Sequence, residues 1–395
     1  MTISRSTTTL AAASLTIVLP LLASCTDNAP SGGGAGASAD PRALSVSATD
    51  TACEVSASTA PSGNLRFSVT NGGSKVNEFY LLAADGLRII GEVENIGPGL
   101  TRDLVLQAPP GSYFTACKPG MVGDGIRSEF TVSESGETLA PNGDEKALVA
   151  QANTLYAAYV RDQTQQLLAK TEAFTKAFVA GQDDKARDLY PRARVHWERV
   201  ETVAESFGDL DPEMDAREAD LEPGQKWTGW HRIEKELWPA RAKNYTAMTA
   251  AEREKYANNL LTNTKTLDQR ARTMTFTADQ IANGAKGLLD EVAKAKVTGE
   301  EEHWSRTDLW DFQGNVDGAR VGFDGLKPLL QARGQTDLMN QIETKFTELQ
   351  ALLDKYRQGD GFVGYDKLTP DQVKELSNAV NALSEPLSKL TAAVI

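Results

Sequence analysis

Two stretches decide the fold of the larger part of this chain: VHWERVE at residues 195–201 and GWHRIE at residues 229–234. The first places two glutamates three residues apart, and the second places a histidine and a glutamate at the same spacing. Residues at i and i+3 lie on one face of an α-helix. Two such helices facing each other would surround a metal ion with carboxylates and an imidazole, as in the cores of metal-binding helical bundles. The sequence therefore predicts a helical bundle with an internal metal site.

The expected metal ligands are Glu198, Glu201, Asp215, His231 and Glu234. Asp215 belongs to the acidic segment that connects the two stretches. Many carboxylates with a single imidazole suit iron, ferrous or ferric, or manganese, and suit zinc less well; copper would favour more sulfur or imidazole. The alternative is that these acids only form ion pairs on helix surfaces, with the basic residues Arg199, Arg232 and Lys235.

Two neighbouring features bear on the site. His196 lies two residues before Glu198, which turns it off the glutamate face, so we expect it to pack or to support the ligands. One of Glu300 to Glu302 could also reach the metal. The alternative for these three acids is the N-terminus of a helix, where negative charge is favoured.

The N-terminus has the form of a lipoprotein signal. Residues 1–25 contain Arg5, an apolar segment too short to span a membrane confidently, and the sequence LASC ending at Cys25. We expect lipidation of Cys25, and residues 26–43, which include SGGGAGASA, form a flexible tether. The mature protein is thus expected outside the cytoplasm, anchored to the cell membrane rather than inserted in it. The alternative is an ordinary secretory signal with a chance cysteine.

The rest of the chain divides by its periodicity. Residues 44–135 hold about seven short alternating runs between turn residues, which predicts a small β-sandwich. Residues 136–145 are a polar linker, and residues 146–395 follow a helical period, which predicts an all-α bundle. Within it, a short helix is expected to end at Tyr190 and another to run from Pro191 to Phe207.

The sandwich contains two cysteines, Cys53 and Cys117, and an even pair in an exported chain favours a disulfide. A sandwich with a cysteine late in the chain resembles a cupredoxin. However, no histidine precedes His196, so its own residues cannot form a blue-copper site. The alternative to a disulfide-linked structural domain is an accessory metal site that uses the cysteines with Glu78, Glu92 and Glu94. A disulfide would remove the thiolates from that site.

Charge and motifs narrow the function further. The net charge of −13 makes nucleic acid an unsuitable partner and suits cations better than anions. No nucleophile elbow, phosphate-binding loop or HExxH zinc-protease helix is present in the sequence.

Together these residues resemble the EfeO family of iron-uptake lipoproteins, which combine a cupredoxin-like and an imelysin-like domain. The likeness covers nearly all of the mature chain. Its most specific stretches are residues 196–201, 204–211, 215–218, 229–238 and 307–313, with 52–54 and 93–99 in the small domain. The lipobox departs from freely secreted members and leaves only the location open.

The resemblance implies an iron importer with three parts, in which this component captures iron and passes it to an iron permease in the membrane. The third part is a haem-containing, dye-decolorising-type peroxidase. The five helical-domain ligands match the family's iron site. The second site would match Cys53, Glu78, Glu92, Glu94 and Cys117. Iron is the expected ion, with zinc or copper as alternatives.

Other functions remain as alternatives. A metallopeptidase of the imelysin-like class would need a metal-bound water and a general base, for which Glu234 is the candidate. A structural or polysaccharide-binding lipoprotein would show no dependence on metal. A ferroxidase would keep the metal and add redox chemistry. We expect a binding protein, not an enzyme.

Overall fold

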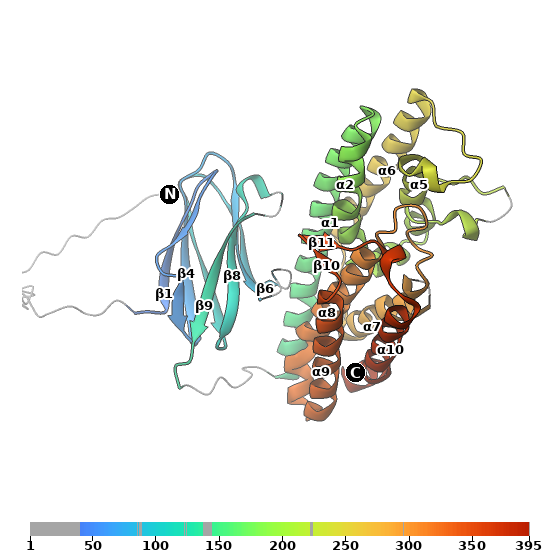
Figure 1. Ribbon diagram of the computed structural model, residues 1–395. Coiled ribbons are helices and arrows are strands. Elements are labelled where there is room, and N and C mark those ends of the chain that lie inside the picture. The colour runs from blue at the N-terminus through green and yellow to red at the C-terminus, as the bar shows by residue number, and fades with distance from the viewer. Residues whose placement is uncertain are drawn as a thin grey trace, which may run out of the picture. The chain divides into compact units, whose positions relative to one another are not determined.

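A computed structural model of the chain describes residues 40–394, except residues 85, 87, 88, 122, 124, 137–143, 222, 223 and 295. The expected signal peptide with Cys25, and most of the tether, lie outside the described residues. Strands occupy residues 43–133 and helices follow from residue 145 (Figure 1). The predicted fold class, a β-sandwich followed by an all-α bundle, is confirmed, while the likeness of the sandwich to cupredoxins stays a prediction.

The sandwich consists of a four-stranded sheet in the order β2-β1-β4-β7 and a five-stranded sheet in the order β3-β9-β8-β5-β6. The pairs are antiparallel except β1 with β4 and β3 with β9, which are parallel. The strands are β1 (Ala43–Ala48), β2 (Cys53–Val55), β3 (Thr59–Pro61), β4 (Gly63–Asn71), β5 (Asn77–Ala83), β6 (Ile89–Ile96), β7 (Thr101–Ala108), β8 (Gly111–Cys117) and β9 (Ile126–Ser133).

The core of the sandwich follows from alternation along its strands. In β4, Leu65, Phe67 and Val69 are buried while the residues between them face outward. The ring of Phe67 packs against Phe79 of β5 and Phe130 of β9, with centroids 5.2 and 5.5 Å apart. Aromatic contacts across the two sheets therefore hold the layers together.

The second part of the chain is helical. Its α-helices are α1 (Glu145–Val179), α2 (Asp183–Glu198), α3 (Glu201–Glu205), α4 (Leu210–Met214), α5 (Trp230–Leu237), α6 (Ala250–Ala271), α7 (Ala278–Lys294), α8 (Asp308–Ala332), α9 (Thr336–Asp354), α10 (Pro370–Leu387) and α11 (Leu390–Val394). Short 3₁₀ turns are η1 (Pro119–Met121), η2 (Glu218–Asp220), η3 (Pro239–Arg241), η4 (Lys296–Thr298) and η5 (Tyr365–Lys367), and a small hairpin joins β10 (Arg357–Gln358) and β11 (Gly361–Phe362).

Helix starts follow the sequence signals closely. Thr249 and Thr369 each form a capping box with the residue three positions later, Glu252 and Gln372 respectively. Pro370 occupies the first helical position of α10, where its missing N–H costs nothing.

Helix α8 packs against α1, α2, α7 and α9. A Cβ added at Gly314 would lie 2.5 Å from the Cβ of Glu198, and one at Gly318 would lie 2.5 Å from the carbonyl oxygen of Arg199. The two glycines therefore permit the close approach of α8 to the end of α2, where the predicted metal residues lie.

The helix boundaries around residue 191 differ from the prediction. Helix α2 begins at Asp183, continues through Pro191 and ends at Glu198. The chain turns at Val200, whose backbone angles (φ −131°, ψ 16°) are not helical, and α3 then starts at Glu201. Glu198 and Glu201 thus lie on two helices, although both still contact the side chain of Lys296.

Among the described residues, no helix combines the length and the apolar character needed to cross a bilayer.

Candidate metal centre

The site is assembled from four segments of the helical part. Helix α2 ends in Arg194 to Glu198, and Asp215 follows α4 directly. Helix α5 carries His231 and Glu234. The turns before α8 contribute the acidic residues at 301 and 302.

Gly229 fixes the start of α5. It has a positive φ of 84°, and a Cβ at this position would lie 2.1 Å from the carbonyl oxygen of Met214. Glycine therefore allows the backbone of α5 to touch the end of α4. This contact sets His231 next to Asp215.

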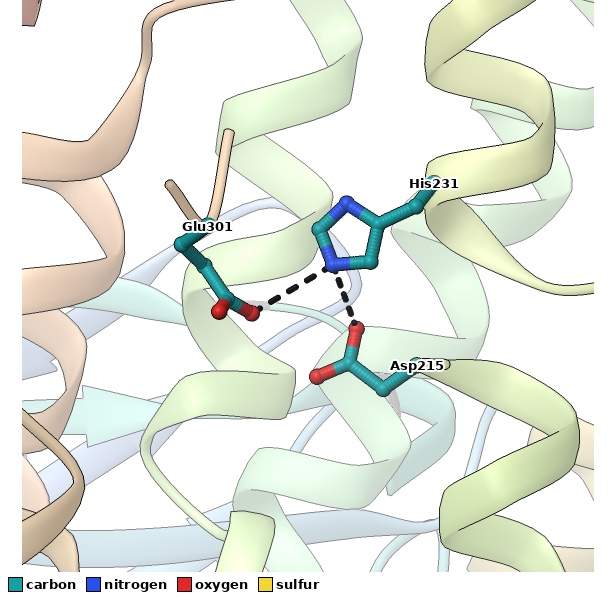
Figure 2. Close-up of side chains that lie close together, drawn as sticks. All are labelled: Asp215, His231 and Glu301. Carbon is teal, nitrogen blue, oxygen red and sulfur yellow. Dashed lines mark hydrogen bonds and ion pairs between the residues drawn. The ribbon is translucent and has the colours of Figure 1, made fainter. Parts of the chain in front are cut away.

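Asp215 and Glu301 converge on the same nitrogen of His231 (Figure 2). Nε2 of His231 lies 3.4 Å from Oδ1 of Asp215 and 3.3 Å from Oε1 of Glu301. Donor atoms bound to one ion at roughly 2.0–2.2 Å are separated by about 3.0–3.5 Å. These three side chains therefore have the spacing of a metal site, which we call the metal triad.

Glu234 holds the other side of the imidazole. Its Oε2 lies 3.1 Å from Nδ1 of His231, and its Oε1 accepts backbone N–H bonds from Trp304 (2.7 Å) and Ser305 (2.6 Å). A carboxylate on the second ring nitrogen orients a ligating histidine and makes it more basic. In this geometry Glu234 orients His231. Together with His231 and Glu302 it also forms a second group of donor atoms within 4.8 Å of one another, so its role as a ligand stays a prediction.

Arg194 is fully buried at the centre of the acids. Its Nη2 lies 2.8 Å from both Glu198 and Glu301, and its Nε lies 2.7 Å from Glu302. It also donates to Asp215, which accepts a further hydrogen bond of 2.7 Å from Nε1 of Trp197. Arg194 thus fixes the carboxylates of the metal triad before any ion is bound.

Lys296 is the common partner of Glu198 and Glu201. Its ammonium group, which is fully buried, donates to Glu198 and, over 3.0 Å, to Glu201. Asn315 of α8 donates a further bond of 3.0 Å to Glu201. In this structure an internal cation therefore occupies the position where the sequence places a metal between these two glutamates.

The pKa values divide the acids into two groups. Burial alone would raise the pKa of both triad carboxyls, but nearby positive charges outweigh it. Arg194 holds the pKa of Asp215 well below its usual value, and Lys296 and His231 lower that of Glu301 to about 2. Burial raises the pKa of Glu198 well above normal, despite Lys296, and raises that of Asp311, next to Glu302, in the same way. The triad carboxylates are therefore the ones held ionised.

His231 is the third member of the triad and behaves in the opposite sense. Burial and Arg194 act to lower its pKa, but hydrogen bonds to Asp215, Glu234 and Glu301 outweigh them and raise it well above 6.5. A proton on Nε2 therefore takes the position that a metal ion would take between the two carboxylates.

The cluster contains more carboxyl groups than cationic groups. Within the part of the chain that the structure describes, neither oxygen of Asp311 receives a hydrogen bond, and Nε of Arg194 lies 3.4 Å from its Oδ1. Three buried groups that carry or can carry positive charge, Arg194, Lys296 and protonated His231, stand among eight carboxyl groups. These are Glu198, Glu201, Asp215, Glu234, Glu301, Glu302, Asp308 and Asp311. A bound cation would take the place of the proton on His231 beside the two ionised carboxylates, so the residues present fit a metal ion.

Two cavities reach the triad. One, of about 420 Å³, is lined by His231, Glu301, Arg217 and Trp304 among others. The second, of about 330 Å³, is lined mainly by acids, with Glu201, Asp215 and Glu301 on its wall. Arg217 and Glu301 border both cavities. A cation therefore has solvent access to the site.

The remaining sequence-predicted residues lie elsewhere. His196 is buried and its Nδ1 lies 2.8 Å from Oε1 of Gln163, so it packs away from the triad. In the sandwich, Cys53 and Cys117 form a disulfide, which leaves no thiolate to bind metal. Glu78 accepts a 2.5 Å bond from Tyr80, and Glu92 pairs with Arg161 at 3.3 Å. The side chain of Glu94 lies outside the described part of the chain.

Sequence reasoning missed Arg194 and Lys296 as partners of the acids. Glu301 was foreseen only as one of three glutamates that could reach the site. The available signal was the spacing of Asp308 and Asp311 on an apolar helix, which indicates that charge is buried there. The cations that pair with the buried acids, Arg194 and Lys296, lie about 100 residues from their partners Glu301 and Glu198 in the sequence.

A helical bundle that buries a Gly-x-His-x-x-Glu stretch against carboxylates matches the imelysin family model (peptidase family M75) over residues 152–390. The chain therefore belongs to the imelysin family.

Relatives extend the likeness beyond the bundle. The chain is 37% identical over 355 residues to the iron uptake system component EfeO of Escherichia coli O1:K1, covering 89% of this chain and 91% of the relative. The EfeO proteins of Escherichia coli K12 and Shigella flexneri are 36% identical over the same shares. The similarity thus includes most of the sandwich as well as the bundle.

Proposed function

We propose that this protein is the iron-binding component of an iron importer, held outside the cytoplasm by a lipid on Cys25, and that it captures iron at the metal triad and passes it to a membrane permease. The observation that carries the proposal is the convergence of Asp215 and Glu301 on Nε2 of His231. The relatives named as iron uptake system components support iron as the cargo. The lipid anchor is supported by the sequence around Cys25 alone.

The ligand chemistry supports iron on physical grounds. Two carboxylates and one imidazole suit ferrous or ferric iron, and zinc binds the same donors. The ligands are buried but border two cavities, so an ion can reach them and leave again. Glu198 and Glu201 are paired with Lys296, and Glu198 also contacts Arg194, which holds the carboxylates of the triad.

The direct test is titration of the metal-stripped protein with iron(II), iron(III)-citrate and zinc(II). His231→Ala and Glu301→Gln each remove one donor and are expected to weaken binding at least about tenfold, the lower end of the effect seen when even supporting residues of a metal site are lost. Glu300→Gln is the matched control, because it removes the same charge one residue away on an exposed side chain. It should bind within about twofold of the parent protein.

Binding that survives both substitutions would move the iron site away from the triad. The sandwich acids Glu78, Glu92 and Glu94 would then be the next candidates for the iron ligands. No binding of any ion would overturn the proposed function.

The proposed partners follow from the need to deliver a captured ion. The permease would accept iron from the triad, and the resemblance to the EfeO family also implies the haem-containing peroxidase. A pull-down with the permease, with and without bound iron, tests the partnership with the permease. Deletion of residues 1–39 removes the proposed anchor and leaves every triad residue in place. Loss of iron capture by cells with this variant would therefore show that capture needs the anchor.

A binding role accounts for Glu234 better than peptidase chemistry does. A general base needs a free carboxylate oxygen near the metal-bound water. Both oxygens of Glu234 already accept hydrogen bonds, from His231, Trp304 and Ser305. A peptide-cleavage assay with and without chelator separates the two functions, because cleavage that stops with chelator would favour the peptidase.

A further inference from the structure

Two buried cations lie at the metal centre, and they are held in different ways. Arg194 forms ion pairs with five carboxylates through three of its nitrogens, so its guanidinium group is fixed from several sides. Lys296 reaches the site with one ammonium group at the end of a flexible side chain. Among the described residues it forms ion pairs with Glu198 and Glu201 alone. The lysine is therefore the cation that could leave the site by rotation of its side chain.

The two glutamates held by this lysine lie beside the metal triad. Three protein donors leave coordination positions open on an octahedral ion. Glu198 contacts the same nitrogen of Arg194 as Glu301 does, each at 2.8 Å. Glu201 lies with Asp215 and Glu301 on the wall of the acidic cavity of about 330 Å³. The two glutamates are therefore placed to supply further donors to an ion in the triad.

Lys296 and a metal ion would compete for these carboxylates. Burial acts to raise the pKa of Glu301, and Lys296 lowers it more than any other neighbouring group does, so the ammonium group lies close to the triad. An ion at the triad would be repelled by this charge. Without an ion, however, the lysine is needed, because Glu198 and Glu201 would otherwise be buried without a counter-charge. Binding and release of an ion are thus both easier if the ammonium group can move.

An alternative partner for the ammonium group lies on α7. Glu291, five residues before Lys296, shares the wall of the acidic cavity with Glu201. Within the described part of the chain, its carboxylate receives no hydrogen bond and forms no ion pair. Burial and Glu201 raise the pKa of Glu291, whereas Lys296 acts in the opposite sense, so this glutamate and the lysine are close to each other. The cavity therefore offers the ammonium group a second carboxylate within its reach.

We propose that Lys296 is a displaceable counter-ion of the metal centre. An incoming cation binds the triad and takes Glu198 and Glu201 as further ligands, and the ammonium group swings into the acidic cavity, where it pairs with Glu291. When the ion leaves, the lysine returns, so the two glutamates are not left as buried unpaired charges. This inference rests on the proposed function and deepens it, because it gives the iron-binding component a built-in means of releasing its cargo.

Acetylation of lysine tests this movement in the parent protein. The metal-free and the iron(II)-loaded protein, both kept free of oxygen, are treated briefly with acetic anhydride, and peptide mass spectrometry measures the modified fraction of each lysine. Lys296 should react at least about tenfold faster once iron(II) is bound, because a fully buried group otherwise reacts only through local opening. An ion that only stabilised the fold would slow this reaction, since binding makes opening rarer. Lys286, on a partly exposed face of α7, is the control and should react equally in both states.

Substitution of Glu291 tests the second position of the lysine. Glu291→Gln should weaken iron(II) binding about two- to fivefold, as for loss of a partly exposed ion pair. Asp290→Asn is the matched control, because it makes the same change of charge one residue away, outside the cavity wall, and should bind as the parent protein does. If Glu291 acts through the lysine, Glu291→Gln should have no effect on affinity in the Lys296→Met background, whereas a general effect of charge would persist there.

The direction of change in Lys296→Met separates a competitor from a structural residue. A competing lysine weakens binding, so the folded variant should bind iron(II) at least about tenfold more tightly than the parent protein. If the variant does not fold, the labelling of the parent protein decides. Weaker binding by the folded variant, or a Lys296 that stays unreactive in the iron-loaded parent protein, would overturn this inference and leave the proposed function intact. No binding of iron(II) by the parent protein would overturn the proposed function itself.

Discussion

At the scale of single residues, the site shows how neighbours assign different states to the same functional group. Asp215 and Asp311 are both buried aspartates near Arg194. The pKa of Asp215 is lowered because Arg194 and His231 act on it directly, whereas burial and Glu302 raise that of Asp311. Ionised and neutral acids therefore stand side by side, and the two whose pKa is lowered face Nε2 of His231, whereas burial raises the pKa of Glu234, at Nδ1, to about 7.

Metal binding should release a proton from His231. Its pKa is raised well above 6.5, so the ring is protonated near neutral pH, and a metal ion must displace the proton on Nε2. Affinity should therefore rise with pH, by about tenfold per unit while the pH stays below this pKa. Calorimetry with zinc(II) in two buffers of different ionisation enthalpy measures the proton count. An affinity independent of pH would contradict the assignment of Nε2.

Lys296 should contribute strongly to the stability of the folded protein. Lys296→Met leaves Glu198 and Glu201 buried without a counter-charge, and breaking a buried pair in this way costs about 3–5 kcal/mol of unfolding free energy. Urea unfolding measures this loss. Lys286→Met is the control, because Lys286 pairs with Asp290 on a partly exposed face and such pairs contribute about 0–1 kcal/mol.

The effect of this substitution should depend on pH in a defined direction. The pKa of Lys296 is raised in the folded protein, so its contribution is complete below 10.5 and is lost only as the pH rises through the folded value. In Lys296→Met, lowering the pH protonates Glu198, whose pKa is already raised. The loss of stability should therefore shrink from pH 8 to pH 5. A constant loss would mean that packing, not charge, accounts for it.

Residue-scale prediction from sequence succeeded where the chemistry is local. The spacing from Gly229 to Glu234 is enough to place His231 and its supporting carboxylate on one helix face. Arg194 and Lys296 could not be found in this way, because an arginine or lysine has the same sequence appearance on a surface as in a core. Only the packing of distant segments decides which cations are buried.

At the scale of elements, the close approach of α8 to α2 depends on glycine. Glycine to alanine within a helix normally stabilises by about 0.5–1 kcal/mol. Gly325→Ala meets nothing within 4 Å and should follow that rule. Gly314→Ala places a Cβ 2.5 Å from that of Glu198 and should instead destabilise by about 1–3 kcal/mol. Thermal unfolding of both variants, which lie on the same helix, makes the comparison.

The clash of an alanine at residue 314 would displace α2, and this displacement should also affect metal binding. Gly314→Ala should weaken zinc(II) binding because Arg194, which fixes Asp215 and Glu301, lies on α2. Gly325→Ala should leave it unchanged. Equal thermal stability of the two variants would show that α2 can shift away from residue 314 without loss of unfolding free energy.

Element boundaries were predictable where a cap is encoded, as at Thr249 and Thr369, and failed where tertiary contact decides. Pro191 was expected to start a helix, yet α2 passes through it. The turn at Val200 has no proline or glycine to announce it. It coincides with the close contact between Arg199 and Gly318 of α8, which lies more than 100 residues later.

At the scale of the whole molecule, the metal triad and the disulfide belong to different parts of the chain. The triad and its buried partners lie between residues 194 and 311, whereas Cys53 and Cys117 join β2 to β8 within the sandwich. Replacing both cysteines by alanine removes a link that closes a loop of 64 residues, worth roughly 4 kcal/mol in the chain-entropy account. The sandwich should therefore unfold at lower urea concentration.

Iron and zinc binding should survive this loss, because none of the triad's hydrogen-bond or ion-pair partners comes from the sandwich among the described residues. Affinity measured below the unfolding transition of the variant should stay within about twofold of the parent protein. A second, weaker binding event that disappears with the disulfide would place a further metal site on the sandwich. Loss of the main event would show that the sandwich shapes the triad, and the bundle could then no longer be regarded as the complete iron-binding unit.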